Sequence, residues 1–463
     1  MTAPPVILLE FNELSPQLLD RWIDAGDLPN FKRLRDSSTI CVTEADELRA
    51  PNLEPWIQWY SLHTGLPFKE HGVFRLSEGA KLTDASVWDI LLNHGMRVMN
   101  FSSMNCRGFD QPGSVFLPDP WNDQQAVSPG DLAPFGVFLK KAIQEQSNAR
   151  WGVAELTGLA KFLVGHGLRA STVAAAVSQI VSEKTSKVPV SWKRVHILDR
   201  ILLDVFAHYY ERERPQFATF FSNSTAHLQH AYWRYLEPAK FSEPVSDTDS
   251  AAYGDAVKYG YQAMDLLLAR MFEIASKRGA RLMFATALSQ QAYTAYEGRG
   301  GRHYYRPHDV AAMLRIMGVT YQAIQPVMAH QYILTFADAQ QKAEAMKRID
   351  EPHVNGRQLF DSSDGHTPQN LIFGSQVYAA LPPDQMFTLR MNSELVPQRF
   401  FDHFYELDAT KSGGHHPDGC FWVQTGEHRR LSDKVSILDV APTILGHFGL
   451  SSEAMRGRQL QLS

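Results

Sequence analysis

Two glutamates occupy positions from which a carboxylate could act on a substrate. Glu10 ends the apolar run PVILLEF, and Glu54 stands just before Pro55 at the expected start of a helix in RAPNLEPWIQW. A carboxylate in a cleft can serve as general acid, general base or nucleophile. We expect both carboxylates to face one cleft. The alternative is that Glu54 only favours a helix N-terminus and that Glu10 forms a structural ion pair.

Two pairs of histidines form the second group of candidates. His227 and His230 lie three residues apart and can share one helix face, and His415 and His416 are adjacent. Together they could hold one zinc or manganese ion, but the sequence places no carboxylate with them. The favoured interpretation is that His230 and His415 are hydrogen-bonded to neighbours, with His227 and His416 at the surface. We therefore expect no cofactor, with a single metal ion at His230 and His415 as the alternative.

Other polar residues near these segments could bind a substrate. Asn52 precedes the expected helix, and capping that helix is its expected role. Arg299 and Arg302 belong to EGRGGRHYYRP, which could clamp an anionic or sugar-containing substrate by bidentate contacts, or could be an ordinary solvated loop. The predicted substrate-binding residues are Asn12, Asn52, His227, Ser289, Gln290, Arg299, Arg302 and His416.

Short apolar runs alternate with helical patterns along the chain. PVILLEF, QFATFFSNS and RLMFATALS are typical of buried strands, and SPQLLDRWIDAG has a Ser cap, a Pro in its first turn and a terminal Gly. This alternation predicts an α/β fold with a mostly parallel sheet covered by helices on both faces. Ligands of such sheets bind beyond the carboxyl ends of the strands.

The chain of 463 residues is long enough for a large core with insertions. We assign the α/β core to residues 1–124, 213–299 and 401–463. The helix-rich segment 125–212 and the mixed segment 300–400 interrupt the alternation, so we interpret them as a helical insertion and a cap or lid.

Composition restricts the class of protein. A hydrophobic content of 44% and a charged content of 21% are ordinary for a globular protein, and a formal net charge of −5 argues against a nucleic-acid partner. Three widely spaced cysteines fit a reducing compartment. The N-terminus lacks the features of a signal peptide, and the most apolar later stretch carries charges. We expect no membrane span and a cytoplasmic location.

Several short sequence motifs occur in the same order as in a known family. GDLPNFKRL and HTGLPFKEHGV are followed far downstream by VAPTILGHFGL and AMRGRQL. This order resembles the alkaline phosphatase superfamily, in particular its type I phosphodiesterase/nucleotide pyrophosphatase branch. The resemblance covers nearly the whole chain. It implies an alkaline-phosphatase-like sandwich with two metal ions at the strand ends and a Thr or Ser nucleophile at a helix start.

Most of the residues that the resemblance implies are replaced. His230 and His415 match two of the family's metal ligands, whereas the nucleophile position is Pro55. The other replaced positions are Asn12 and Ala226, each in place of an Asp, and Ser289 with Gln290 in place of an Asp-His pair. Two imidazoles and an amide make a weak metal site, so we expect the two-metal mechanism to be absent.

Three functional hypotheses follow. In the first, the chain is a divergent enzyme that acts on a phosphate-, sulfate- or sugar-containing small molecule without two metals, using Glu10, Glu54, His230 and His415. In the second, it is a pseudoenzyme that binds such a ligand without turnover. In the third, it is a single-metal hydrolase.

Overall fold

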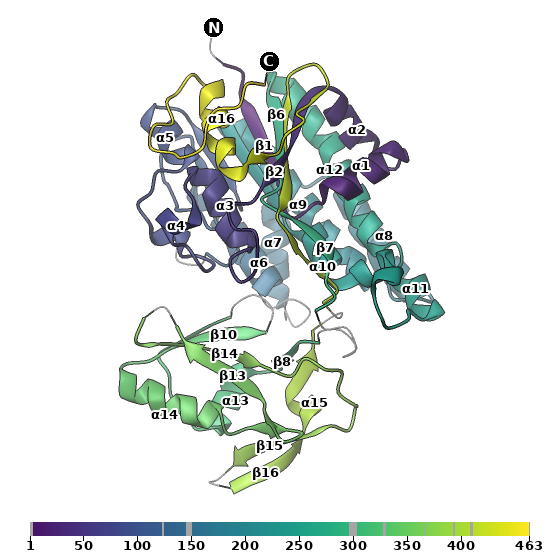
Figure 1. Cartoon of the computed structure of the whole chain (residues 1–463), viewed down its shortest axis with the longest axis vertical. Coiled ribbons are helices and arrows are strands. Elements are labelled where there is room, and N and C mark those ends of the chain that lie inside the picture. Colours follow the sequence, from purple (N-terminus) through teal and green to yellow (C-terminus); the bar gives the residue numbers. More distant parts are fainter. Residues whose placement is uncertain are drawn as a thin grey trace. The chain divides into compact units, whose positions relative to one another are not determined.

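The computed structural model describes residues 3–122, 125–144, 151–295, 303–326, 330–365, 367–391, 394–407 and 411–462. Its largest described sheet has nine strands (Figure 1). The strands lie in the order β20 (Arg429–Arg430), β2 (Ser38–Glu44), β19 (Asp418–Gln424), β6 (Arg281–Ala285), β1 (Val6–Phe11), β5 (Phe217–Ser222), β3 (Val98–Phe101) and β4 (Val115–Leu117), and β21 (Val435–Ser436) pairs with β2.

The sheet is mostly parallel, as the alternation of strands and helices predicted. β1 runs parallel to both β5 and β6, and β3 runs parallel to β4 and β5. Only β19 runs antiparallel to its two neighbours, β2 and β6, among the strand pairs described in this sheet. The predicted α/β sandwich with a mostly parallel sheet is therefore confirmed.

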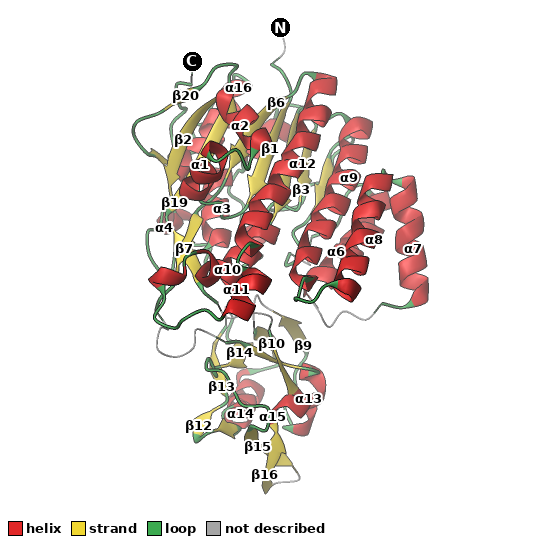
Figure 2. Cartoon of the chain, turned by 90° about the vertical axis from the view of Figure 1, so that its right-hand side faces the viewer, coloured by secondary structure: helices red, strands yellow, loops and turns green. Residues whose placement is uncertain are grey.

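Helices cover both faces of the sheet (Figures 1 and 2). On one side lie α1 (Pro16–Asp24), α2 (Pro29–Asp36), α9 (Val195–Glu213) and α12 (Ala256–Arg278). On the other lie α3 (Pro55–Thr64), α5 (Val87–Asn93) and α16 (Val440–His447), and α4 (Phe68–His71) follows α3. All six residues of β1 are buried, because a central parallel strand has no solvent-facing side.

The chain divides into two compact units. The first holds Met1–Pro238, Val245–Ala292 and Gly413–Ser463, and the second holds Ala239–Pro244 and Tyr293–Ser412. The predicted insertion at 300–400 falls within the second unit, whereas the predicted insertion at 125–212 is part of the first. The helices of that segment are α6 (Ala133–Gln144), α7 (Val153–Gly165), α8 (Ala170–Thr185) and most of α9.

Two further helices of the first unit lie between β5 and α12. α10 (Ser224–Leu236) begins just after β5, and α11 (Asp247–Tyr253) precedes α12. β7 (Ser289–Ala292) and β18 (Gly413–His416) form a separate antiparallel ribbon.

The second unit has a hydrophobic core of its own, which includes Tyr305, Leu334 and Phe400. One four-stranded sheet holds β13 (Phe360–Asp364), β14 (Asn370–Ser375), β10 (Gln331–Thr335) and β9 (Ala323–Pro326). Another holds β12 (Arg357–Gln358), β11 (His353–Val354), β15 (Met386–Met391) and β16 (Glu394–Arg399). β8 (Tyr305–Pro307) pairs with β17 (Phe404–Glu406), and the helices are α13 (Val310–Ile316), α14 (Ala339–Ile349) and α15 (Phe400–His403).

Candidate functional site

One carboxylate and two imidazoles meet beyond the end of β1. Glu13 lies in the turn after β1, His230 on α10 and His415 on β18, and their potential ligand atoms all lie within 4.8 Å of one another. Glu13 Oε2 is 3.1 Å from His230 Nε2 and 3.7 Å from His415 Nε2. The group belongs entirely to the first unit.

The second ring nitrogen of each histidine is held by the backbone. His230 Nδ1 lies 2.9 Å from the carbonyl oxygen of Gly413, and His415 Nδ1 lies 2.9 Å from that of Leu53. A carbonyl oxygen only accepts hydrogen bonds, so each Nδ1 must be the donor. Nε2 of each ring therefore faces Glu13, where it presents a lone pair when the ring is neutral and donates a hydrogen bond when the ring is charged. This arrangement is typical of metal-binding histidines, whose second nitrogen is oriented by a carbonyl or carboxylate.

The Glu13 carboxylate is buried and ionised. Burial alone would raise its pKa, but the charges of His230 and His415 and the hydrogen bonds from His230 and Gln290 outweigh burial and lower the pKa to about 2. Asn12 Nδ2 donates to Oε1 at 2.9 Å, and Gln290 Nε2 donates to Oε2. Asn12 and Gln290, which the sequence suggested as substrate contacts, thus orient the carboxylate.

The backbone at Glu13 adopts an uncommon conformation. Its φ is +63°, in the left-handed region that residues other than glycine uncommonly adopt. Gln229 Nε2 donates to the Glu13 carbonyl at 2.8 Å, and Tyr261 donates to Gln229 Oε1 at 2.8 Å. Asn12 is held in turn by Trp59 Nε1, which donates to Asn12 Oδ1 at 2.8 Å. This network fixes the turn that carries Glu13.

Glu54 lies at the edge of the same group. It is the N-cap residue of α3, and its Oε2 is 3.4 Å from His415 Nδ1. The Glu54 side chain is 27% exposed, so it can meet solvent as well as the histidine. Pro55 is the first residue of α3, a position that favours proline because no helical N–H is needed there.

The prediction that Asn52 caps α3 is wrong. Glu54 holds the N-cap position, and Asn52 Nδ2 donates to Glu47 Oε2 at 3.1 Å. Asn52 lies two residues before the cap, so its side chain stabilises the preceding turn.

The expectation that Glu10 faces a cleft with Glu54 is also wrong. Glu10 is completely buried, and its Oε1 lies 2.8 Å from His63 Nε2 on α3. Strand side chains alternate between the two faces, and Val6 and Leu8 pack into the core beneath α3 and α5. Glu10 continues that series and therefore points under the helix. Its contact with His63 fits the alternative expectation, in which Glu10 forms a structural pair in the core.

The remaining predicted residues do not join the group. Among the described residues, the cluster of potential ligands consists of Glu13, His230 and His415, without His227 or His416. His227 is exposed on α10, and His416 Nδ1 accepts the backbone N–H of Asp418 at 3.1 Å. Ser289 is fully buried and pairs with His416 between β7 and β18. Arg299 and Arg302 lie outside the described residues.

The positions expected for a second metal ion do not fit one. Asn12, Pro55, Ser289 and Gln290 supply neither a carboxylate nor an imidazole, and Glu10 points away. Divalent cations need charged oxygen or several imidazoles to offset their dehydration. The residues present therefore fit one cation and not two.

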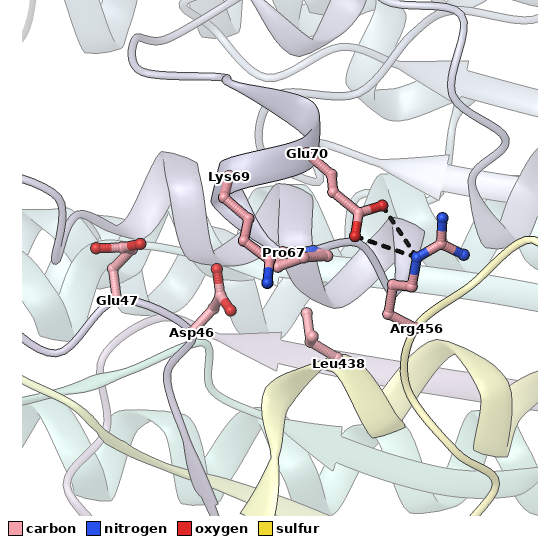
Figure 3. A pocket seen from close by; sticks show the side chains of 7 residues that line it. All are labelled: Asp46, Glu47, Pro67, Lys69, Glu70, Leu438 and Arg456. Atoms are coloured by element: carbon pink, nitrogen blue, oxygen red, sulfur yellow. Dashed lines mark hydrogen bonds and ion pairs between the residues drawn. The ribbon is translucent and has the colours of Figure 1, made fainter.

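A pocket of about 400 Å³ lies elsewhere in the first unit (Figure 3). Its walls come from Asp46, Glu47, Pro67, Lys69, Glu70, Leu438 and Arg456. Arg456 Nε lies 3.0 Å from Glu70 Oε2, and Figure 3 marks this ion pair. The lining includes none of the cluster residues, and two of its five charged side chains, Glu70 and Arg456, pair with each other, so we place the candidate site at Glu13.

Comparison with known proteins decides the family. Residues 6–286, more than half of the chain, match the sequence model of type I phosphodiesterase / nucleotide pyrophosphatase. The chain belongs to this family. The resemblance drawn from the ordered motifs is thereby confirmed.

Two solved structures are similar to this chain over most of its length. Phosphonoacetate hydrolase from Sinorhizobium meliloti 1021, in complex with phosphonoacetate, shares 13% identity at a TM-score of 0.42, with 95% of this chain and 94% of that chain covered. Murine ectonucleotide pyrophosphatase/phosphodiesterase 5 shares 9% identity at a TM-score of 0.39, with 98% and 97% covered. No curated protein matches the sequence.

Sequence reasoning missed Glu13. The signal was present in EFNEL, where a second acid follows Glu10 by three residues and lies just beyond the strand. Ligands of parallel sheets bind beyond the strand ends, so the acid outside the strand was the better candidate.

Proposed function

We propose that this family member is a hydrolase for a small phosphorylated or sulfated substrate, and that it works with one zinc or manganese ion held by Glu13, His230 and His415. One observation carries the proposal. Both Nδ1 atoms donate to backbone carbonyls, so both Nε2 atoms face a single buried carboxylate. Three electron-rich groups facing one another are unfavourable unless protons or a cation lie between them.

The donor set suits a catalytic zinc site. Two imidazoles and one carboxylate are a common set for such sites, which keep a further position open for substrate or water. Ligand atoms around a tetrahedral zinc ion are roughly 3.3 Å apart. The separations of Glu13 Oε2 from the two Nε2 atoms, 3.1 and 3.7 Å, bracket that value. A cation bound here would supply a Lewis acid for a phosphoryl or sulfuryl oxygen.

Glu54 is the residue that we assign to proton transfer. The family resemblance expects a hydroxyl nucleophile at position 55, where proline has no hydroxyl. Water must then be the attacking group, and a partly exposed carboxylate beside His415 can accept its proton. Asn12 and Gln290 keep the Glu13 carboxylate in place.

Turnover of nitrophenyl esters tests this function. Phosphate mono- and diesters and sulfate esters are assayed with the protein as purified, after chelation, and after return of zinc or manganese. We expect hydrolysis of at least one ester class that chelation abolishes and the cation restores. Glu54→Gln should lower kcat by about 10²–10⁴-fold without loss of bound cation. The exposed carboxylate variant Glu344→Gln, in the second unit, serves as the matched control.

The second candidate is a ligand-binding protein without turnover. It is favoured by Pro55, which removes the nucleophile that the family resemblance expects. The same ester assays distinguish the two functions, because a binding protein would hold the cation yet hydrolyse none of the esters. Hydrolysis that survives complete chelation would instead contradict any role for a metal ion and support a metal-free enzyme.

A further inference from the structure

Exposed apolar side chains concentrate on α7 and α8, two helices that follow one another in the sequence. Among the described residues, fourteen large apolar side chains are exposed, and half of them belong to these helices of 13 and 16 residues. Single exposed apolar residues need no explanation, but such a concentration does. The seven side chains are Val153, Leu156, Val164, Val173, Val177, Ile180 and Val181.

The exposed side chains form a stripe on each helix. On α8, Val177, Ile180 and Val181 follow Val173 by four, seven and eight residues, a spacing that places all four on one face. These side chains are 45–55% exposed. Thr172 is the only residue of α8 that is fully buried. A surface helix normally turns such a stripe toward the core, so here the apolar face is directed outward.

The charge around the stripes is positive. Residues 151–194 contain six Lys or Arg and two Asp or Glu, a formal charge of +4 in a chain whose total is −5. Both acids are already paired, Glu155 with Lys141 at 2.8 Å and Glu183 with Arg194. Within the described part of the chain, the exposed Lys161, Lys184 and Lys187 have no ion-pair partner, and Lys184 continues the α8 stripe one turn beyond Ile180 and Val181.

We propose that α7 and α8 dock this protein onto an anionic lipid surface. An exposed aliphatic stripe bordered by lysines is the pattern by which helices lie on a membrane, through apolar burial and attraction to anionic headgroups. A twofold contact with a second copy would set the same cationic patch against itself. No described helix has the length and apolar character to cross a bilayer, so the contact is peripheral.

Co-sedimentation with lipid vesicles tests the apolar part of this inference. The full chain is mixed at low salt with vesicles of neutral phosphatidylcholine, or with vesicles containing a quarter phosphatidylglycerol. We expect binding to the anionic vesicles alone. The double variant Val177→Gln/Ile180→Gln should lower the partition coefficient at least tenfold. The control is Leu266→Gln on α12, which removes an equally exposed (57%) apolar side chain outside the stripes and should bind like the wild type.

The lysines are tested in the same assay. Lys184→Gln and Lys187→Gln should each lower the partition coefficient on the order of fivefold, and raised salt should do the same for the wild type. Lys277→Gln on α12, with a side chain 55% exposed, should have no effect. Thermal unfolding of every variant confirms that the fold is kept.

Three results would overturn the inference. The first is wild-type protein that stays in the supernatant with anionic vesicles. The second is stripe variants that bind as the wild type does. The third is a dimer in analytical ultracentrifugation that Val177→Gln/Ile180→Gln converts to monomer, since the stripes would then be covered by a second copy. None of these measurements depends on the site at Glu13, so they remain independent of the proposed function.

Discussion

At the scale of single residues, two glutamates three positions apart have opposite roles. Glu10 ends a strand and continues the Val6 and Leu8 series into the core, where it contacts His63. Glu13 lies beyond the strand and meets His230 and His415. Strand alternation shows from sequence that Glu10 and Leu8 share a face. It does not show that α3 covers that face, so the cleft was assigned to the wrong acid.

The two acids should respond differently to the same substitution. Glu10→Gln keeps the shape but removes a charged hydrogen bond in the core, so we expect the free energy of unfolding to fall by roughly 1–3 kcal/mol. Urea denaturation measures this change. Affinity for zinc should stay within about twofold of the wild type, because Glu10 is not a ligand in our account. A folded Glu10→Gln variant that had lost the cation would contradict the assignment.

At the scale of elements, the ribbon of β7 and β18 positions the site. It sets His415 opposite Gln290, and the Gly413 carbonyl holds His230 Nδ1. A Cβ at Gly413 would lie 2.3 Å from the Gln229 carbonyl oxygen and 2.4 Å from Gln290 Oε1. Only glycine allows this close approach.

Gly413→Ala should therefore weaken the site without touching a ligand. Displacement of β18 shifts His415 itself and the Gly413 carbonyl that orients His230, and loss of such an outer group typically costs 10–100-fold in metal affinity. Zinc titration by calorimetry and the melting temperature measure the effect. Gly130→Ala is the control, because a Cβ there meets no atom within 4 Å. Unchanged zinc affinity in Gly413→Ala would show that the ribbon does not position the histidines.

The contact between α3 and His71, the last residue of α4, gives a pH prediction. His71 Nδ1 accepts the N–H of Val73 at 3.0 Å and Nε2 lies 3.0 Å from Ser61 Oγ, and burial lowers the pKa of His71 to about 4, against a small opposing effect of Asp84. Below pH 6.5 the unfolded chain binds a proton that the native ring does not. Stability should thus fall by about 2–3 kcal/mol as the pH drops from 6.5 to 4.

His71→Gln should remove this part of the pH dependence, although it lowers stability at neutral pH. Denaturant unfolding between pH 7 and 4 measures the slope. The exposed His94→Gln variant should keep the wild-type slope. An unchanged slope in His71→Gln would place the titrating group elsewhere.

Elements were more predictable than their ends. The apolar runs of β1, β5 and β6 and the helical pattern of α1 and α12 are visible in sequence, because periodicity reports which side chains are buried. The N-cap of α3 was misplaced by two residues, since the turn before the helix uses Asn52 to bind Glu47. Cap geometry depends on tertiary neighbours that the sequence does not show.

At the scale of the whole molecule, the second unit is inserted within one ribbon. Ala292 of β7 pairs with Gly413 of β18, and the residues between them form a unit with its own core. The sequence indicated an insertion near 300–400 from the break in the α/β alternation. The limits of this insertion, Tyr293 and Ser412, could not be predicted from the sequence, because β7 and β18 are short, polar strands whose sequences resemble loops.

Removal of the insertion should leave the first unit folded. Because Ala292 and Gly413 are partners in an antiparallel pair, a two- to four-residue hairpin turn can replace Tyr293–Ser412. We expect cooperative thermal unfolding and zinc affinity near that of the full chain, because all three proposed ligands come from the first unit. A soluble, folded deletion protein without zinc affinity would show that the second unit contributes to the site.

We propose that one cation is held by Glu13, His230 and His415. The most direct test is the metal content of protein purified without chelator, measured by plasma mass spectrometry for the wild type, Glu13→Gln, His230→Ala and, as a matched control, His416→Ala. We predict about one equivalent of zinc or manganese in the wild type and in His416→Ala, and little in the other two. No metal in a folded wild type after incubation with zinc, or metal retained in Glu13→Gln and His230→Ala, would show that these three residues do not hold a cation.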